Sequence, residues 1–318
     1  MKSVSSIMVL VMVLAMVLAA CGRAVPSSDG ADDPAEISTS YEQQVLDWRS
    51  GRLERLLAPN GYLNQIGLFW LDTGTYKIGS GADNDIRLPA GAASEIGVFD
   101  VSSNGVHIQV RDGIEVLNFG EPVTAILIAD DTTEEPVQLS HGSIAWTVIK
   151  RDGRFAIRVR DFEHPFANTF GPLPYFPIDA SMRVDAALQR YDEPRIANVG
   201  TVIEGLGYHP ESPGVVEFVI DGQRYALEAY ASGDRLFFVF GDATNRDDTY
   251  GAGRFLYADL PGDDGQTVMD FNRAYSPPCA FNDFSTCPVA SPRNRLPIRV
   301  EAGEKYDAAL HYSADTSL

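Results

Sequence analysis

The stretch VVEFVIDGQRYALEAYASGDRLFFVF (residues 215–240) consists of three β-rich runs separated by two short turns. The turns, Asp221-Gly222 and Gly233-Asp234, have the composition of two-residue hairpin loops. The runs are rich in the β-branched and aromatic residues that fit a pleated sheet. Two consecutive hairpins build an antiparallel sheet, so this stretch predicts that strands of this kind make up the fold.

The same alternation of short apolar runs and turns extends in both directions from residues 215–240. Asp152-Gly153 is a third hairpin signal of the same type. Regular short strands with glycine and proline between them are typical of sandwiches and barrels. The fold class predicted is therefore all-β, an antiparallel sandwich or barrel-like set of sheets. The remaining expected strands are 68–71, 75–78, 97–101, 106–110, 123–128, 145–150, 155–159, 255–258, 268–271, 298–300 and 308–312.

One amphipathic helix is expected before the strands, over residues 40–57. Ser40 and Gln43 have the spacing of a capping box, in which each side chain satisfies a free backbone N–H of the other residue. Apolar residues at 41, 45, 48, 53, 56 and 57 recur at helical spacing, and Pro59-Asn60-Gly61 ends the pattern. We interpret this segment as a helix that packs against the sheets.

The N-terminus has the features of an export signal. Lys2 precedes an unbroken apolar run over residues 7–20, which is short for a membrane span but typical of a secretory signal. Small residues then lead to Cys21, and this order resembles a bacterial lipobox. We expect acylation of Cys21, for example with palmitate, and hence an exported protein anchored by lipid to a bacterial membrane, on its periplasmic or extracellular face.

Four segments are expected along the chain. Residues 1–20 form the signal peptide and 21–40 a flexible acidic tether rich in Pro, Ser and Asp. Residues 41–160 hold the helix and an N-terminal β region, and 161–318 a C-terminal β region. Residues 41–318 as one continuous domain is the alternative.

Charge and motifs exclude several classes of function. The 44 acidic residues outnumber the 25 Lys and Arg, so the formal net charge is −19, which disfavours nucleic acid as a partner. The sequence lacks a G-x-S-x-G elbow, an H-E-x-x-H motif and a P-loop. The five histidines are scattered, and the acidic loop 242–248 lacks EF-hand spacing, so it is expected to be a solvated turn. No metal site and no cofactor is expected.

The segment TYKIGS (residues 75–80), followed by DNDIRLP (83–89), resembles the start of a forkhead-associated β-sandwich. The resemblance implies a similar sandwich within residues 41–160. Such modules place an Arg beside the Gly-Ser, whereas here Lys77 precedes Ile78, and their Ser-Arg-x-x-His segment is absent after Pro89. Phosphopeptide binding is therefore not expected of this region.

The C-terminal third carries the motifs GRFL (253–256), DFNRAY (270–275), PPCAF (277–281), TCP (286–288) and NRLP (294–297). Together with GLFWL (67–71), these motifs resemble the bacterial family called domain of unknown function 1684, over residues 41–312. Ser276 and the segment 289–291 depart from the pattern expected of that family. The resemblance implies a family identity and no reaction.

Cys279 and Cys287 are the thiols that remain after acylation of Cys21. Exported compartments are usually oxidising, so a disulfide between the two is the first interpretation. A metal site with two thiolates and a nucleophilic Cys279 are the alternatives.

A polar cluster is predicted on the last hairpin. If the strand 254–258 pairs with 268–272 so that Ala258 faces Val268, then Arg254, Asp270 and Asn272 share one face. Tyr250 and Tyr275 are expected to line the same opening. The cluster is either a ligand site or a buried ion pair that fastens the loop around Cys279.

Two functions follow from these residues. The first is a lipid-anchored envelope protein that binds a small ligand through Arg254, Asp270, Asn272, Tyr250 and Tyr275, or acts as a scaffold for an unidentified envelope partner. The alternative is a hydrolase-like enzyme with Asp270 as base or Cys279 as nucleophile.

Overall fold

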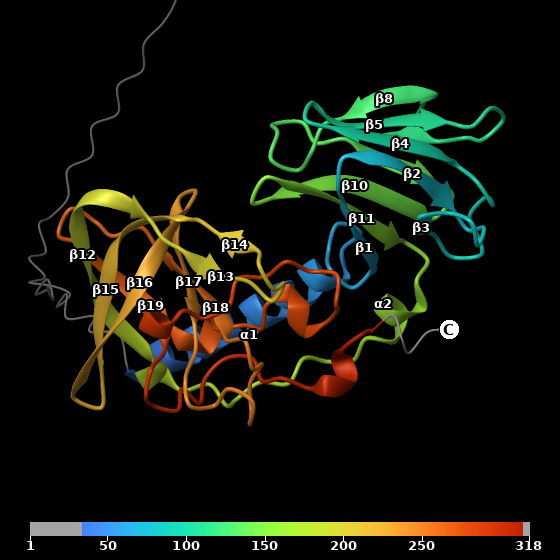
Figure 1. Ribbon diagram of the computed structural model, residues 1–318. Helices are drawn as coiled ribbons and strands as arrows, with labels where there is room; N and C mark the ends of the chain where they lie inside the picture. Colours follow the sequence, from blue (N-terminus) through green and yellow to red (C-terminus); the bar gives the residue numbers. More distant parts are fainter. Residues whose placement is uncertain (1–33, 314–318) are drawn as a thin grey trace, which may run out of the picture.

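The computed structural model describes residues 34–313, which form one long helix and two antiparallel β units (Figure 1). The predicted all-β class with one N-terminal helix is confirmed. The helix, α1, spans Pro34–Leu57. A short second helix, α2 (Pro165–Thr169), lies in the connection between the β units, and His164 caps it by accepting a hydrogen bond from the Phe166 N–H.

The first unit is a sandwich of two sheets with the strand orders β1-β11-β10-β9-β6-β7 and β3-β2-β4-β5-β8. All of its strand pairs are antiparallel except β2 with β3. Its strands are β1 (Gln65–Leu71), β2 (Gly74–Gly79), β3 (Ile86–Arg87), β4 (Gly97–Ser102), β5 (Gly105–Val110), β6 (Leu117–Asn118), β7 (Glu121–Pro122), β8 (Ala125–Ile128), β9 (Gln138–His141), β10 (Ile144–Arg151) and β11 (Arg154–Asp161).

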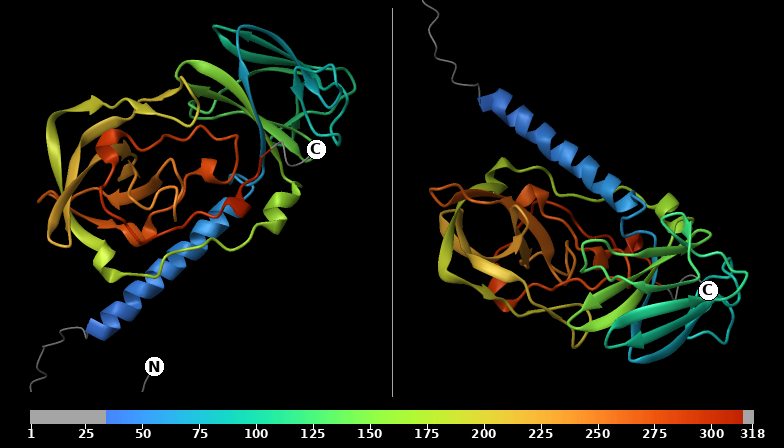
Figure 2. Two further views of the ribbon diagram at one scale, coloured as in Figure 1. Left: turned by 60° about the horizontal axis from the view of Figure 1, so that its bottom comes forward. Right: turned by 90° about the horizontal axis from the view of Figure 1, so that it is seen from above.

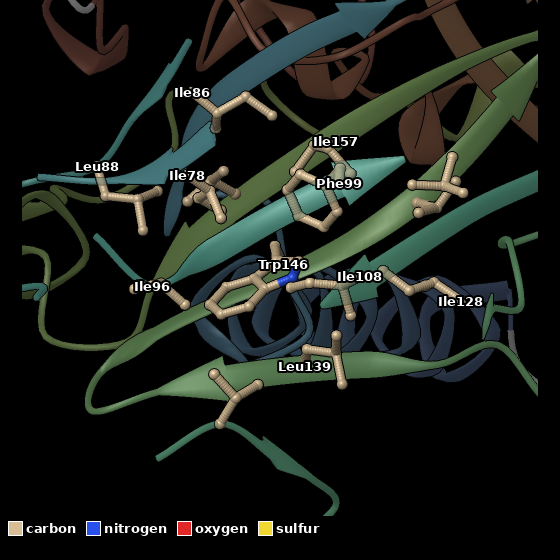
Figure 3. Close-up of a cluster of buried hydrophobic side chains, with 14 of the residues drawn as sticks. Ile78, Ile86, Leu88, Ile96, Phe99, Ile108, Ile128, Leu139, Trp146 and Ile157 are labelled. Carbon is tan, nitrogen blue, oxygen red and sulfur yellow. The ribbon is translucent and has the colours of Figure 1, made fainter. Parts of the chain in front are cut away.

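The sandwich is held by an apolar core between its sheets (Figure 3). Trp146 of β10 and Ile157 of β11 point into this core and meet Phe99 and Ile108 from the opposite sheet, all of them buried. Because side chains alternate along a strand, the intervening residues of β11, including Arg158, lie on the outer face of the sheet. That outer face is directed at the second unit.

The second unit is one curved six-stranded sheet, a half-barrel, with the order β18-β17-β16-β15-β12-β19. Figure 2 shows the sheet curling around the C-terminal segments, whose residues Phe271, Leu296 and Val300 fill its inner face. Its strands are β12 (Arg183–Ile196), β15 (Glu211–Ile220), β16 (Gln223–Ser232), β17 (Arg235–Phe240), β18 (Arg254–Asp259) and β19 (Gln266–Asp270), with a separate ribbon of β13 (Val199–Gly200) and β14 (Gly207–Tyr208).

Short 3-10 turns complete the chain: η1 (Ala180–Met182), η2 (Phe271–Arg273), η3 (Pro278–Ala280), η4 (Pro292–Asn294) and η5 (Ala308–Leu310). The three predicted hairpin turns are confirmed. Asp221 and Gly222 both have positive φ, 50° and 73°, in the loop between β15 and β16, as the twist of a tight hairpin requires.

Several local predictions differ from the structure. The helix begins at Pro34 instead of Ser40, so it includes residues 34–40 of the predicted tether. Proline suits the first helical position, where no intrahelical N–H bond is needed, and Gln43 binds Asp47 instead of closing a capping box with Ser40. Residues 298–300 form no strand, residues 308–310 form η5, and the long strand β12 was not predicted. The predicted signal peptide, Cys21 and residues 21–33 lie outside the described residues.

The predicted pairing of β18 with β19 is also wrong. β18 pairs with β17, and β19 pairs with β12, so the two are the edge strands of the same sheet. α1 runs beside the half-barrel at these edges (Figure 2). This arrangement positions the site described next.

Candidate functional site

A cavity of about 640 Å³ lies between α1 and the two edge strands of the half-barrel. Both edge strands line it, β18 through Phe255, Tyr257, Ala258 and Asp259, and β19 through Val268 and Asp270. α1 contributes Trp48, Arg52 and Arg55, and the rest of the lining is Tyr62, Arg183, Arg235, Arg273, Tyr275 and Pro278.

Positive charge dominates the cavity, because its lining has five arginines and two carboxylates. Arg55, Arg183 and Arg235 form no ion pair with any residue between 34 and 313. Arg235 lies over the ring of Tyr257, with its guanidinium carbon 4.2 Å from the ring centre. In a chain of net charge −19, an unneutralised group of arginines attracts an anion from solution.

The other two arginines have acidic partners. Arg273 places its Nε 3.2 Å from Asp270 Oδ2, and Arg52 places its Nε 3.3 Å from Glu304 Oε2. Arg52 also donates to the Ser276 carbonyl at 2.9 Å, and it lies over the Tyr275 ring. Arg52 is thus mainly an anchor for α1, not one of the unpaired arginines.

One side of the cavity is aromatic. Tyr257 and Tyr275 are nearly parallel, with 14° between their planes and 6.4 Å between ring centres. Tyr275 also contacts Phe255 edge to face and Trp48 of α1. Burial raises the pKa of the Tyr275 hydroxyl, so the hydroxyl stays neutral and the aromatic wall carries no charge at physiological pH. A planar apolar group can stack against such a wall.

Asp270 lines the cavity, and Asn272 lies beside it without lining it. The Tyr41 hydroxyl of α1 donates to Asp270 Oδ1 at 2.8 Å, and Asn272 Nδ2 donates to the Tyr41 oxygen at 2.9 Å. Burial and Asp270 raise the pKa of Tyr41. The fully buried Asn272 also bonds the backbone of Asp179 in both directions, so it ties α1 and η1 to η2.

The predicted cluster of Arg254, Asp270 and Asn272 does not form. Arg254 points to the inner face of the half-barrel, next to Phe240, whereas its neighbours Phe255 and Tyr257 point to the cavity. Its partner is Asp242, at 2.8 Å, and it donates to the carbonyls of Ala302 and Val300. The expectation that the loop 242–248 is solvated is wrong at Asp242, which is buried.

Tyr250, Cys279 and Cys287 lie together outside the cavity, in a buried cluster behind Phe255. The Cys279 N–H donates to Cys287 Sγ at 3.2 Å, and both cysteines are free thiols. The hydrogen bond with Cys287 and burial raise the pKa of the Cys279 thiol. Burial and the neighbouring Cys279 raise the pKa of the Tyr250 hydroxyl. A neutral thiol is a weak nucleophile. A nucleophilic cysteine needs a base such as histidine, but both ring nitrogens of His311 contact other groups, the Ala280 carbonyl oxygen and Asp283.

Of the predicted ligand-binding residues, the structure therefore places Asp270 and Tyr275 in the cavity and leaves out Arg254, Asn272 and Tyr250. The residues that the sequence analysis missed are the arginines at 55, 183, 235 and 273, together with Trp48 and Tyr257. They come from α1, β12, β17, β18 and η2, and no linear motif connects them.

The site lies largely within a segment that is recognisable by sequence. Residues 168–305 match the model of a family described as "Protein of unknown function (DUF1684)". The matched segment holds Arg183, Arg235, Asp270 and Tyr275 but not α1, and it is shorter than the resemblance predicted over 41–312. No curated protein matches the sequence significantly.

Two solved structures are similar to parts of the chain. One is the solution NMR structure of an uncharacterized protein of Haloarcula marismortui, 28% identical over 44% of this chain and 79% of that one, with a TM-score of 0.38. The other is the FHA-2 domain of a Mycobacterium tuberculosis ABC transporter, 27% identical over 28% of this chain and 77% of that one, with a TM-score of 0.22.

Two features are absent from residues 34–313. None of the helices there combines the length and the apolar character needed to cross a bilayer. Nor does that part of the chain bring three or more metal-ligating side chains together.

Proposed function

We propose that the protein binds a small anion with a planar apolar group in the cavity under α1. The observation that carries this proposal is the excess of arginines in the cavity of a strongly acidic protein. Arg183 and Arg235 have no acidic partner and are free to pair with a carboxylate, sulfonate or phosphate group of the ligand. Tyr257 and Tyr275 offer the surface on which its ring stacks.

A series of three ligands with one ring system and different charges tests this proposal. We expect the anion 2-naphthoate to bind, the neutral 2-naphthamide to bind more weakly, and the cation 2-naphthamidine to bind least, as measured by isothermal titration calorimetry. Arg235→Gln should weaken 2-naphthoate about tenfold, because a charged hydrogen bond is lost. Arg224→Gln is the matched control, since Arg224 is exposed and pairs with Glu217 outside the cavity. Equal affinities for all three compounds would contradict the proposal.

We also propose that Cys21 is acylated and anchors the protein to the outer face of a bacterial membrane. The support is the sequence alone, in the apolar run 7–20 and the small residues before Cys21. In membrane fractionation, the wild-type protein should sediment with the membranes. Cys21→Ser should abolish labelling by a palmitate analogue and move the protein to the soluble fraction.

In an exported protein, the neighbouring thiols of Cys279 and Cys287 would form a disulfide. The proposal rests on their contact in a loop stiffened by three prolines at 277, 278 and 288. Titration of the unfolded protein, purified without reductant, should find neither thiol free. Two reactive thiols in that sample would exclude the disulfide.

A further inference from the structure

A second recess, of about 230 Å³, lies where the sandwich meets the half-barrel. Arg151 and Arg158 line it from β10 and β11, and the opposite wall comes from residues between 201 and 208 and between 285 and 288. It shares Tyr62, Phe255 and Pro278 with the cavity under α1 but none of that cavity's arginines. The two cavities are therefore adjacent, and each is lined by its own arginines.

Arg158 is an unpaired cation in this recess. Strand alternation turns it away from the sandwich core, to the outer face where Thr147 and Leu68 are its neighbours on the adjoining strands. Its Nε is shielded from solvent and has no hydrogen-bond partner, and Arg158 forms no ion pair within residues 34–313. The residue as a whole is only half-buried, so its positive charge is available to an anion that enters the recess.

The charged groups around Arg158 leave an excess of positive charge. The nearby carboxylate of Asp131 is already engaged by Arg151, which binds both of its oxygens at 2.8 and 2.6 Å. Arg160, two residues along β11, donates to the Gly61 carbonyl and to Asn64 Oδ1, which are uncharged. Burial and Arg151 lower the pKa of Arg158 to about 10, so its guanidinium is still charged at neutral pH. These three arginines thus have one carboxylate among them, and Asp152, which accepts from the N–H of the lining residue Gly207, is a second acid at the edge of the recess.

We propose that this recess is a second anion-binding site, in which Arg158 holds a phosphate or carboxylate group between the two β units. A planar guanidinium presents paired N–H donors that match two oxygens of such a group. The bound anion would restore the missing partner of Arg158. This site does not depend on the ligand of the cavity under α1.

Inorganic phosphate is the probe for this site, with the purified full-length protein and ionic strength held constant by potassium chloride. We expect phosphate to raise the melting temperature in a saturable manner, since a ligand that binds the folded state stabilises it. In Arg158→Gln the apparent Kd should increase about tenfold or more, because a charged hydrogen-bond donor is lost. Arg224→Gln, at an exposed arginine outside both cavities, should leave the phosphate response unchanged, whereas Arg235→Gln reports on the cavity under α1.

Other outcomes would overturn the proposal. Absence of a saturable shift in the wild type would do so, as would an unchanged response in Arg158→Gln. Loss of the response in Arg235→Gln alone would place phosphate in the cavity under α1. Should the glutamine variant fail to fold, Arg158→Met repeats the test with an apolar chain of similar length. Loss of the response in both single variants would also contradict a separate site.

Discussion

Arg254 and Asp242 form an ion pair in which both side chains are fully shielded from solvent. The guanidinium also satisfies two backbone carbonyls, so it holds the loop 242–248 and the segment 300–302 to the inner face of the half-barrel. The two interpretations of Arg254 from sequence were a ligand site and a structural ion pair. Its place in the fold favours the second, although with a different acid from the one predicted.

Arg254→Ala is therefore expected to destabilise the fold. Removal of the guanidinium leaves a buried carboxylate without its partner, which typically costs about 3–5 kcal/mol. Urea unfolding measures this difference. Arg235→Ala, at an exposed arginine, should cost less than about 1 kcal/mol. Loss of 2-naphthoate binding with unchanged stability in Arg254→Ala would show that Arg254 is a ligand residue after all.

Glu304 makes the stability depend on pH. Burial raises the pKa of its carboxyl in the folded state, against the opposing effect of Arg52. The folded state then binds a proton more tightly than the unfolded state, so stability falls as the pH rises from the unfolded pKa, about 4.3, through the raised folded pKa. The contribution of Glu304 to the slope of unfolding free energy against pH is at most about 1.4 kcal/mol per pH unit. This contribution disappears in Glu304→Gln.

Unfolding free energies across that pH range, measured for wild type and Glu304→Gln, check the sign. Glu301→Gln is the control, because Glu301 is exposed and pairs with Arg299. Parallel pH profiles for wild type and Glu304→Gln would contradict the prediction.

At the scale of elements, α1 is fixed by residues spaced along one face. Tyr41, Trp48 and Arg52 contact Asp270, Tyr275 and Glu304, and Leu56 is buried with Leu63 and Phe281 at the far end. This periodic face could be predicted, because helical spacing is visible in sequence. Which strands it would meet could not, because β18 and β19 lie far from α1 in sequence.

Leu56→Ala should cost about 2–5 kcal/mol, because it empties a fully buried position between α1 and the loop around Phe281. Leu57→Ala removes the same atoms one residue later, where 42% of the side chain is exposed, and should cost less than about 1 kcal/mol. Thermal and urea unfolding of both variants measure the difference. Equal losses would mean that α1 packs with another face.

The hairpins could also be predicted, because the residues that determine them are adjacent in sequence. Asp152-Gly153 and Asp221-Gly222 carry their turn type in two residues, and a two-residue loop fixes which strands pair. The pairing of β19 with β12 depends on a partner about 80 residues earlier, so no turn indicates it. That missing information caused the wrong register at Asp270, and with it the wrong polar cluster.

At the scale of the whole molecule, side chains from one β unit bind the backbone or side chains near the other. Asn282 Nδ2 donates to the Tyr62 carbonyl, and Ser285 Oγ donates to the buried Gln65 of β1. The acidic composition predicted that nucleic acid is not a partner. The total charge did not indicate the arginine-lined cavity. A local excess of positive charge becomes visible only when distant strands meet.

The two β units are expected to unfold together. Trp146 reports on the sandwich core and Trp48 on the contact of α1 with the half-barrel. In variants that keep one of these tryptophans, with phenylalanine at the other two positions, the fluorescence midpoints in urea should coincide, as in a two-state transition. Separate midpoints would show that the units are independent.

The contacts of α1 extend from Tyr41 to Leu56, about 22 Å along the helix axis. The first of them, between Tyr41 and Asp270, borders the arginine-lined cavity. Tension applied to the chain before α1 would load this contact and strain the wall that the helix provides. In the anion complex proposed above, mechanical pull at the N-terminus and occupancy of the cavity would then oppose each other, so stretching the chain would favour release of the anion.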